Sequence, residues 1–279
     1  MASVDGSNGD LIRVAAIGDL HCTRTSQGAY QPLLAQIAQT AEVLILCGDL
    51  TDYGTPEEAH VLVKELSAAN KMPILAVLGN HDYESGQADA VKHILNQADV
   101  KVLDGDAIEV HGIGFAGTKG FCGGFGRGTL SAWGEHAVKT FVQEAIDEAM
   151  KLESALARLR TQHRVAVLHY APIRATVEGE PLEIFPFLGC SRLEEPLNRY
   201  QVSAVVHGHA HRGAPEGKTG SGTPVYNVSI QTMRASYPDR PPFRMLTFPA
   251  TPQASRQATP PAAAASSPVH AQPVESAVR

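Results

Sequence analysis

A buried strand that stops at a cluster of polar side chains constrains this chain more than any other feature. The apolar run 74–78 is followed directly by Gly79, Asn80, His81 and Asp82. Ligands in open α/β sheets collect at the carboxyl ends of strands, so this segment predicts a binding or catalytic site. Asn and Asp are also ordinary turn residues, and a plain turn is the alternative interpretation of the segment alone.

Four other segments repeat this pattern and favour a site over a turn. Each apolar run is followed by polar side chains, in order Asp19 and His21, Asp49 and Asp52, His169, and finally His207 and His209. In the first and last pairs the two side chains are two residues apart, so on an extended chain they point to the same side. Gly208, between the last two, has no side chain to obstruct their approach to a ligand.

The chemistry of these groups predicts a site for two divalent metal ions. Carboxylates, an amide oxygen and imidazoles suit an ion such as Mn, Fe or Zn. The groups are too many for one ion. A single carboxylate can bridge two ions, which lie about 3.5–4 Å apart in two-metal phosphoryl-transfer sites.

The order of the elements predicts an α/β fold. Strands at 12–17, 43–46 and 74–78 alternate with helices at 32–40 and 56–70, and Thr55 is the expected N-cap of the second helix. Two successive strand–helix–strand crossovers imply parallel pairing with right-handed connections. Beyond them the pattern predicts helices at 87–97, 131–160 and 192–200, and strands at 100–102, 107–110, 113–115, 164–168, 202–206, 225–230 and 243–248.

Length and composition predict one large domain with two unstructured ends. The 279 residues suit a polar, flexible N-terminus at 1–10, a catalytic domain at 11–250 and a disordered Pro/Ala-rich tail at 251–279. The first residues lack the basic and apolar regions of a secretory signal. No apolar stretch approaches the roughly 20 residues that span a bilayer. We therefore expect a cytoplasmic protein with no membrane partner, and leave a homodimer open.

Charge and cysteine usage exclude some function classes. A net charge of −6 and the lack of a dense basic run argue against a dedicated nucleic-acid-binding protein. A nuclease stays open, because it needs only a local groove. The cysteines at 22, 47, 122 and 190 form no CxxC pair, so neither a zinc ribbon nor a disulfide framework is expected.

The five motifs together resemble those of the calcineurin-like metallophosphoesterases. They read Asp-x-His, Gly-Asp, Gly-Asn-His-Asp, a strand-terminal His and Gly-His-x-His, in that order, and they span residues 19–209. Within the family, the chain is similar to small bacterial members related to class III cyclic-nucleotide phosphodiesterases. The resemblance implies an α-β-β-α sandwich, in which two stacked mixed β-sheets are flanked by helices.

The resemblance also implies a role for each motif residue. One ion would be held by Asp19, His21 and His209, the other by Asn80, His169 and His207, with Asp49 bridging both. His81 would contact the phosphate and protonate the leaving oxygen, and Asp52 would orient His81. His211 matches no ligand in this alignment of motifs and is expected at the rim of the site or behind the ligands.

The expected activity is hydrolysis of phosphate esters, foremost small-molecule phosphodiesters such as cyclic nucleotides. A hydroxide bridging the two ions would attack phosphorus, and His81 would act as general acid. A phosphomonoesterase or a nuclease on the same site is the alternative, and a metal-free scaffold is the non-enzyme alternative. The chain keeps every ligand position, which disfavours the scaffold. Tyr53 stands where the related protein phosphatases carry a phosphate-binding Arg and cannot replace its charged bidentate contact.

Contacts to the substrate are less sharply predicted. The glycine-rich segment 117–128 is either a plain surface loop or a lid over the site, and it lacks the Gly-Lys-Ser/Thr ending of a phosphate-binding loop. Trp133, beside it, is expected to be a packing anchor. Candidate substrate contacts are Arg24, Phe121, Phe125, Arg127 and Arg174.

Overall fold

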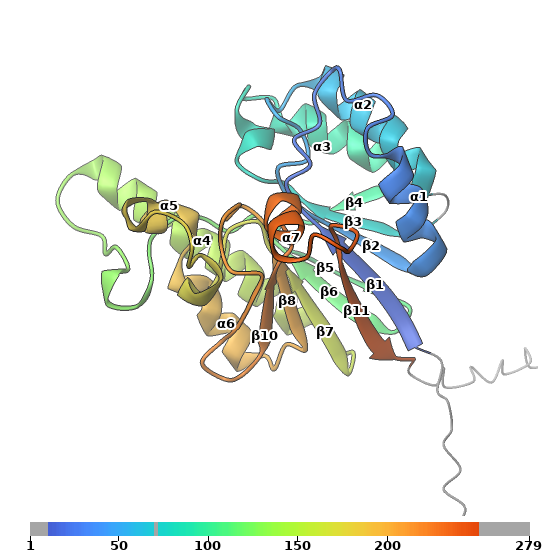
Figure 1. Ribbon diagram of the computed structural model, residues 1–279. Helices are drawn as coiled ribbons and strands as arrows, with labels where there is room; N and C mark the ends of the chain where they lie inside the picture. Colours follow the sequence, from blue (N-terminus) through green and yellow to red (C-terminus); the bar gives the residue numbers. More distant parts are fainter. Residues whose placement is uncertain (1–10, 70–71, 251–279) are drawn as a thin grey trace, which may run out of the picture.

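Two β-sheets stack face to face, and helices cover their outer faces (Figure 1). The computed structural model describes residues 11–69 and 72–250. The predicted flexible N-terminus and disordered tail, 1–10 and 251–279, lie outside these residues. The predicted α-β-β-α sandwich is confirmed.

The first sheet has the strand order β11-β1-β2-β3-β4. Its strands are β1 (Leu11–Ile17), β2 (Val43–Cys47), β3 (Ile74–Val77), β4 (Val100–Val102) and β11 (Arg244–Pro249). The first four run parallel, as the crossovers predict, and β11 pairs antiparallel with β1. All five residues of β2 are buried, as expected for a parallel strand covered on both faces.

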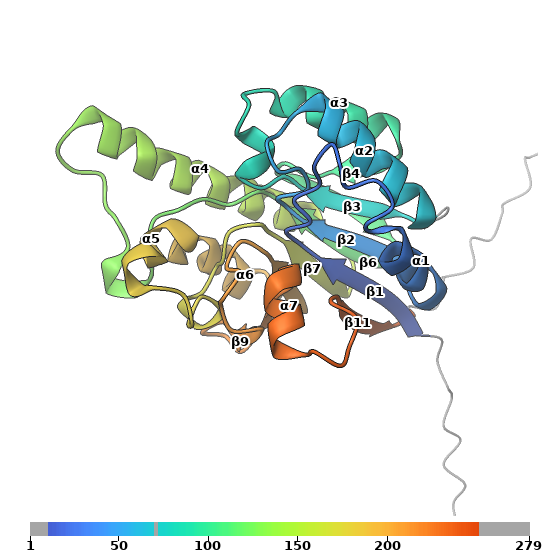
Figure 2. The same ribbon diagram turned by 45° about the horizontal axis from the view of Figure 1, so that its top comes forward.

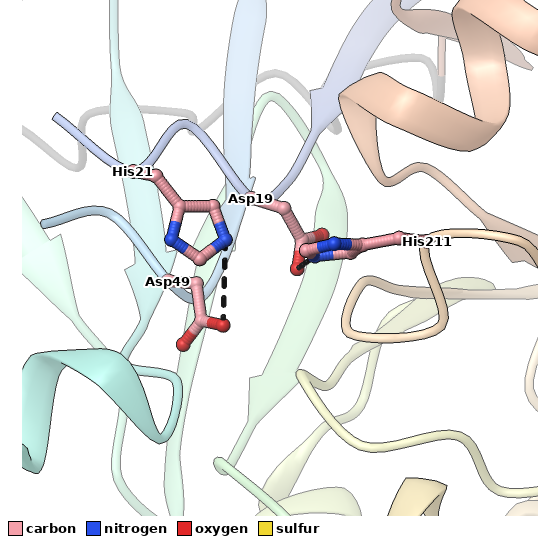
Figure 3. Close-up of side chains that lie close together, drawn as sticks. All are labelled: Asp19, His21, Asp49 and His211. Carbon is pink, nitrogen blue, oxygen red and sulfur yellow. Dashed lines mark hydrogen bonds and ion pairs between the residues drawn. The ribbon is translucent and has the colours of Figure 1, made fainter. Parts of the chain in front are cut away.

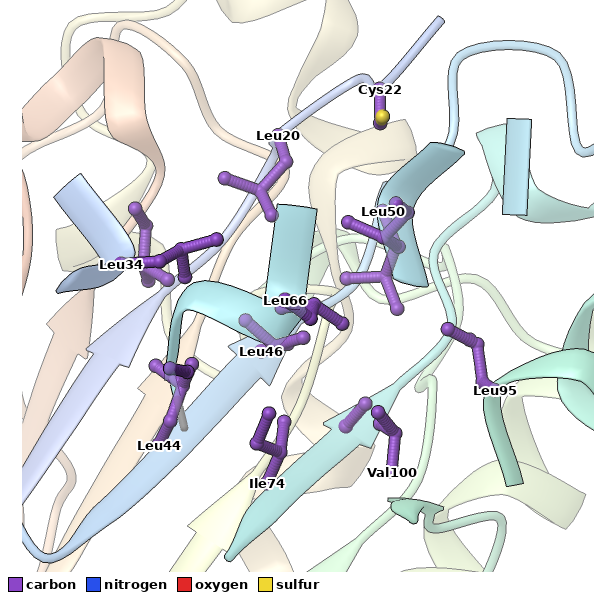
Figure 4. Packing of buried hydrophobic residues seen from close by; sticks show 14 of the residues in the cluster. Leu20, Cys22, Leu34, Leu44, Leu46, Leu50, Leu66, Ile74, Leu95 and Val100 are labelled. Atoms are coloured by element: carbon purple, nitrogen blue, oxygen red, sulfur yellow. The ribbon is translucent and has the colours of Figure 1, made fainter. Parts of the chain in front are cut away.

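The helices of the first sheet are α1 (Gln31–Thr40), α2 (Pro56–Leu66) and α3 (Ala88–Gln97). They pack on its outer face through a buried apolar cluster that includes Leu34, Leu66 and Leu95 (Figure 4). α2 begins with the predicted N-cap. The Thr55 hydroxyl accepts from the Glu58 backbone N–H, and the Glu58 carboxylate accepts from the Thr55 N–H.

The second sheet has the strand order β5-β6-β7-β8-β10-β9. Its strands are β5 (Asp106–Val110), β6 (Ile113–Gly117), β7 (His163–Val167), β8 (Ala204–His207), β9 (Glu216–Lys218) and β10 (Pro224–Asn227). The four inner strands are parallel, and the two edge strands are antiparallel to their neighbours. Side chains such as Val77, Phe115 and Val167 fill the space between the two sheets.

The second sheet is covered by α4 (His136–Arg158) and α6 (Glu194–Arg199), while α5 (Phe185–Leu188) and α7 (Ile230–Ser236) are short. Two sequence predictions need correction here. α4 begins at His136 rather than near 131, and its first turns project beyond the sheet (Figure 2). Trp133 precedes the helix and is 58% exposed, so it is not a packing anchor.

The strand predicted at 225–230 is also too long. β10 ends at Asn227. Ser229 is the N-cap of α7, because its hydroxyl accepts a hydrogen bond from the Thr232 backbone N–H, which has no partner within the helix. Among the helices of the described residues, none has the length and apolar character that crossing a membrane requires.

Candidate metal centre and active site

The chemistry-bearing residues of all five motifs meet at one end of the two sheets. Parallel strands bring their carboxyl ends to the same edge, so the segments after β1, β2, β3, β7 and β8 lie together. The side chains that approach one another there are Asp19, His21, Asp49, Asn80, His81, His169, His209 and His211. Figure 3 shows four of them.

The backbone in these segments is left-handed at several non-glycine residues. The φ angles are 59° at Asp19, 45° at His21, 47° at Asp49 and 70° at His209. Positive φ is uncommon outside glycine and costs free energy, and such residues cluster at functional sites. These turns bend each chain segment sharply at the strand end and aim its side chain toward the shared centre.

Glycines permit the close approach of the segments. A Cβ at Gly79 would lie 2.2 Å from the backbone nitrogen and a carboxylate oxygen of Asp49. A Cβ at Gly208 would lie 2.3 Å from the Asp19 carboxylate, and one at Gly48 would lie 2.4 Å from the His169 ring. All three distances are shorter than non-bonded contacts allow. The predicted need for glycine between His207 and His209 therefore has a steric basis.

A first ligand group consists of Asp19, His21, Asp49 and His211, whose donor atoms all lie within 4.8 Å of one another. His211 Nε2 is 3.0 Å from Asp19 Oδ1, and His21 Nε2 is 3.8 Å from Asp49 Oδ2 (Figure 3). His21 Nε2 is buried and has no hydrogen-bond partner among the described residues. A buried lone pair beside two carboxylates fits a divalent cation, because the ion would satisfy all three groups.

A second ligand group shares Asp49 with the first. The donor atoms of Asp49, His169 and His209 lie within 4.8 Å of one another. His169 Nε2 is 3.4 Å from Asp49 Oδ1 and 3.0 Å from the amide oxygen of Asn80. The oxygens and nitrogens of this group again suit a divalent ion. Asp49 is thus placed where one carboxylate can serve both groups.

Hydrogen bonds fix which ring nitrogen of two histidines faces the second group. His169 Nδ1 lies 2.9 Å from the carbonyl of Cys47, and His209 Nε2 lies 3.1 Å from the carbonyl of Phe187. A carbonyl can only accept, so each of these nitrogens carries the proton. The opposite nitrogens, His169 Nε2 and His209 Nδ1, keep the lone pairs that a metal ion needs. The lone pair of His169 then faces the Asn80 amide oxygen, a second acceptor, at 3.0 Å, and a shared cation would satisfy both.

Electrostatics favour the metal-binding protonation states of His209 and Asp19, whereas His211 would have to release a proton to bind an ion. Burial, together with the neighbouring His169, lowers the pKa of His209 to about 3, so this imidazole is neutral. Burial alone would raise the pKa of Asp19, but the hydrogen bond from His211 and the nearby histidine charges outweigh it and lower that pKa. For His211, burial opposes protonation, yet its hydrogen bond to Asp19 raises its pKa.

The structure does not bring His207, which the sequence predicted as a metal ligand, into either group. It ends β8 with a fully buried ring, whose Nε2 lies 2.8 Å from the Thr176 hydroxyl and whose Nδ1 lies 2.8 Å from the Gly208 carbonyl. The prediction assumed an extended chain through His209. Because the chain turns there, the facing pair is His209 and His211. The signal was available in the sequence, since Gly-His-x-His begins at Gly208.

The last two histidines of the motif lie in different ligand groups. His211, expected at the rim, lies in the first group, and His209 lies in the second group rather than the first. The structure also brings the other predicted ligand side chains, including Asn80, close to one another.

His81 stands beside the first group with a half-open ring. Its Nδ1 lies 2.7 Å from the backbone carbonyl of Asp52, which fixes the proton on Nδ1 and leaves Nε2 free to exchange a proton. The Asp52 carboxylate is 3.9 Å from His81 Nδ1 but 3.1 Å from His21 Nδ1. Asp52 therefore orients His81 through its backbone, and its carboxylate orients the candidate ligand His21 instead.

Asp82, for which the sequence indicated no separate role, is a structural residue. Its buried carboxylate accepts hydrogen bonds from the backbone N–H groups of Leu50, Thr51 and Gly79. Burial, and the nearby charge of Asp49, raise the pKa of Asp82. It joins the second and third motifs and so holds Asp49 against Asn80.

Residues 12–213 match the family model described as calcineurin-like phosphoesterase. The chain belongs to the calcineurin-like phosphoesterase family. It is accordingly a metal-dependent phosphoric ester hydrolase by class, and its two ligand groups fit the dinuclear centre typical of that family.

Solved structures support the calcineurin-like fold. Phosphopantetheinyl hydrolase from Mycobacterium tuberculosis aligns with a TM-score of 0.62 at 16% identity, covering 85% of this chain and 96% of that one. Purple acid phosphatase PPD1 from yellow lupin (Lupinus luteus) seeds aligns with a TM-score of 0.51 at 12% identity, covering 80% of this chain and 44% of that one. Identities this low establish the shared fold alone. No curated protein matches the sequence.

The predicted substrate contacts of this calcineurin-like protein lie in different surroundings. Phe121 lines a pocket of about 240 Å³ that also includes Asn80. Phe125 instead packs against a small apolar cluster around Phe185. Arg174 is exposed, lies over the Phe185 ring at 5.4 Å and pairs with Glu178. Arg24 and Arg127 are exposed as well. Among the described ion pairs and hydrogen bonds, none joins these three arginines to the ligand groups.

Proposed function

We propose that this protein hydrolyses small-molecule phosphodiesters at a centre for two divalent ions. The observation that carries the proposal is the pair of ligand groups that share Asp49, together with the partnerless buried nitrogen of His21. The first ion would be held by Asp19, His21, Asp49 and His211, and the second by Asp49, Asn80, His169 and His209. Oxygen and nitrogen ligands without sulfur favour Mn, Fe or Zn.

When bound, the ions would activate a water molecule as nucleophile and neutralise the charge that develops on the phosphate. The remaining chemistry falls to side chains. His81 is held by the Asp52 carbonyl with Nε2 free, so that in its protonated form it can donate a proton to the departing alkoxide. His21 is held in turn by the Asp52 carboxylate at 3.1 Å. Asp52 thus fixes the orientation of both His81 and His21.

The charges around the site favour a diester over a monoester. A monoester dianion carries more charge and would benefit from an additional fixed cation, as Arg provides in other phosphate sites. Arg24, Arg127 and Arg174 are exposed and unconnected to the ligand groups. Lys119 lines the adjoining pocket, but Glu144 lies 3.9 Å away and offsets its charge. A singly charged diester needs no further cation.

Cyclic nucleotides are the first substrates to test, because the chain's motifs are similar to those of class III cyclic-nucleotide phosphodiesterases. The name of the M. tuberculosis protein of similar fold points to phosphopantetheinyl esters as a second class.

The deciding experiment profiles the purified, Mn-loaded full chain against cyclic AMP, bis(4-nitrophenyl) phosphate and 4-nitrophenyl phosphate. We expect faster turnover of the diesters and two ions per chain by metal analysis. Asp49→Asn should weaken both sites. Faster monoester hydrolysis would favour a phosphomonoesterase, and hydrolysis of none of the esters would refute the proposal.

A further inference from the structure

A small pocket with aromatic walls adjoins the second ligand group. It has a volume of about 240 Å³, and its lining consists of Asn80, Tyr83, Lys119, Phe121, Glu144 and Tyr170. Asn80 belongs to the candidate metal centre, because its amide oxygen lies 3.0 Å from His169 Nε2. A group attached to a phosphate at the metal centre can therefore extend into this pocket. Its size suits one ring rather than a drug-sized ligand.

Three aromatic rings surround the ammonium group of Lys119 in this pocket. The Nζ atom lies 4.8 Å from the ring centre of Phe121, 5.4 Å from that of Tyr170 and 5.6 Å from that of Tyr83. Aromatic side chains favour other flat rings in offset or edge-to-face contact. The side chain of Lys119 is only 11% exposed. Its charge is thus kept largely out of water, and burial lowers its pKa.

The Lys119 ammonium group uses only one of its N–H donors in a hydrogen bond to the described residues. A lysine offers three N–H donors, and one is directed at the Gly120 carbonyl at 2.9 Å. Glu144 Oε1, at 3.9 Å, is too far for a hydrogen bond. The other two N–H groups have no hydrogen-bond acceptor among the described residues, so an acceptor on a ligand can take one of them. Because Glu144 balances the charge of Lys119, a neutral acceptor fits better than an anionic one.

The segment that carries Lys119 is fixed on both sides. The Lys119 carbonyl accepts from the backbone N–H groups of His169 and Tyr170, both at 3.0 Å. On the other side, the buried Glu148 carboxylate accepts from the Thr118 hydroxyl at 2.5 Å and from the Gly120 N–H at 2.8 Å. These contacts hold the pocket wall rigidly beside the metal centre, as a preformed binding site requires.

We propose that this pocket selects substrates whose ester arm carries a single aromatic ring with a neutral hydrogen-bond acceptor. Tyr83, Phe121 and Tyr170 would contact the ring, and Lys119 would donate to the acceptor. The inference rests on the proposed phosphoesterase function, which places the phosphate at the metal centre. It assigns Lys119 and Tyr83 a role in specificity that the motif analysis did not give them.

Equilibrium binding of non-hydrolysable phosphonates to the Mn-loaded full chain tests the pocket without requiring turnover. Calorimetry would compare methylphosphonate, benzylphosphonate and 4-carbamoylbenzylphosphonate. We expect the benzyl compound to bind about tenfold or more tightly than the methyl compound, because a buried ring is removed from water. The carbamoyl oxygen should add about a further tenfold through its bond to a charged donor.

Variants separate the two contributions. Tyr83→Leu, at a partly exposed ring, and Phe121→Leu should reduce the benzyl-to-methyl ratio severalfold. Lys119→Met should abolish the gain in affinity from the carbamoyl group but leave the benzyl-to-methyl affinity ratio unchanged. Phe125→Leu, in the same glycine-rich segment but outside the pocket, and the exposed Lys139→Met are the matched controls and should change neither ratio.

The outcomes distinguish this inference from the proposed function. Equal affinity for methyl- and benzylphosphonate, or no binding of either, would overturn the proposal that the pocket selects an aromatic ring, whether or not esters are hydrolysed. A tenfold benzyl preference in a protein that hydrolyses no ester would uphold the pocket and refute the phosphodiesterase instead. Equal effects of Phe125→Leu and Phe121→Leu would also overturn the assignment, since only Phe121 lines the pocket.

Discussion

At the scale of single residues, the partner of each ring nitrogen separates the roles of the histidines. His207 has both nitrogens engaged by Thr176 and its own neighbour, so it offers no lone pair to an ion. His211 faces Asp19 directly. His81 has one nitrogen fixed by a carbonyl and the other free. Residue type and spacing identify the set, but only the hydrogen bonds separate ligand, proton donor and structural residue.

His81→Ala should leave the metal centre intact and slow the chemistry. His81 lies outside both ligand groups that contain Asp49, and clusters instead with His21 and Asp52, which are already joined by hydrogen bonds. We expect two ions per chain and a loss of about 10²–10⁴-fold in kcat for a diester with an alkoxide leaving group. The loss should be much smaller for 4-nitrophenyl esters, since nitrophenolate leaves without a proton. Equal losses for both leaving groups would rule out the general-acid role.

His211→Ala and His207→Gln should differ in their effect on the metal content. His211→Ala removes a member of the first ligand group, so metal analysis should find about one ion per chain with the fold retained. In His207→Gln the side-chain amide can still bond to Thr176, and two ions should remain bound with only a modest loss of stability. If His207→Gln lost an ion and His211→Ala kept both, His207 would be a ligand and His211 would not, as the sequence predicted.

Lys119→Met should show that the buried ammonium is costly to the fold. Burial lowers the folded-state pKa of Lys119 below its ordinary value of 10.5. A lysine with a lowered pKa disfavours folding while it is charged, and this cost disappears as pH rises through the folded pKa toward 10.5. Urea unfolding at pH 7 and pH 10 measures it. We expect the variant to gain stability relative to wild type at pH 7, and less so at pH 10, with Lys139→Met as control. A relative gain that grew with pH would contradict this sign.

At the scale of elements, most site residues owe their place to a strand that stops at a glycine, and His169, which follows Leu168 after β7, is the exception. Gly48, Gly79 and Gly208 stand where a Cβ would overlap a candidate ligand or its backbone. The apolar runs and these glycines are local features, which is why the strands and most of the ligands could be predicted. The turn at His209 is not local, because it depends on the Asp19 carboxylate that accepts from the His209 N–H at 2.9 Å.

Gly79→Ala should therefore empty the metal centre while the helices and strands persist. The new Cβ would fall 2.2 Å from Asp49 Oδ1, the carboxylate that both groups share. We expect metal content below one ion per chain and turnover reduced at least about 10²-fold, the penalty of a roughly 1 Å displacement at a reacting centre. Gly128→Ala is the matched control, because a Cβ there meets nothing within 4 Å. A Gly79→Ala protein with two tightly bound ions would show that the backbone can shift without cost.

At the scale of the whole molecule, the candidate centre joins the two sheets. Asp19, His21, Asp49 and Asn80 follow strands of the first sheet, whereas His169, His209 and His211 follow strands of the second. The Gly-His-x-His motif indicates the pair His209 and His211, but Asp19 and His211 are far apart in the sequence, and no local pattern indicates which of the two histidines reaches Asp19. The aromatic pocket was missed for the same reason, since its walls come from segments after β3, β6 and β7 and from α4.

Because ligands from both sheets would hold each ion, metal removal should destabilise the molecule as a unit. An ion that binds only the folded state adds about 2.7 kcal/mol at a free concentration of 100 times its Kd. For a domain of this size, each kcal/mol shifts Tm by roughly 2–4 °C, so two ions should raise Tm by about 10–20 °C in a single transition. Calorimetry of Mn-loaded and chelator-treated protein checks this. His211→Ala should keep about half of the shift. A Tm that stayed constant while metal analysis showed the ions leaving would mean that the ions bind the folded state no more tightly than the unfolded chain, and so do not hold the two sheets together.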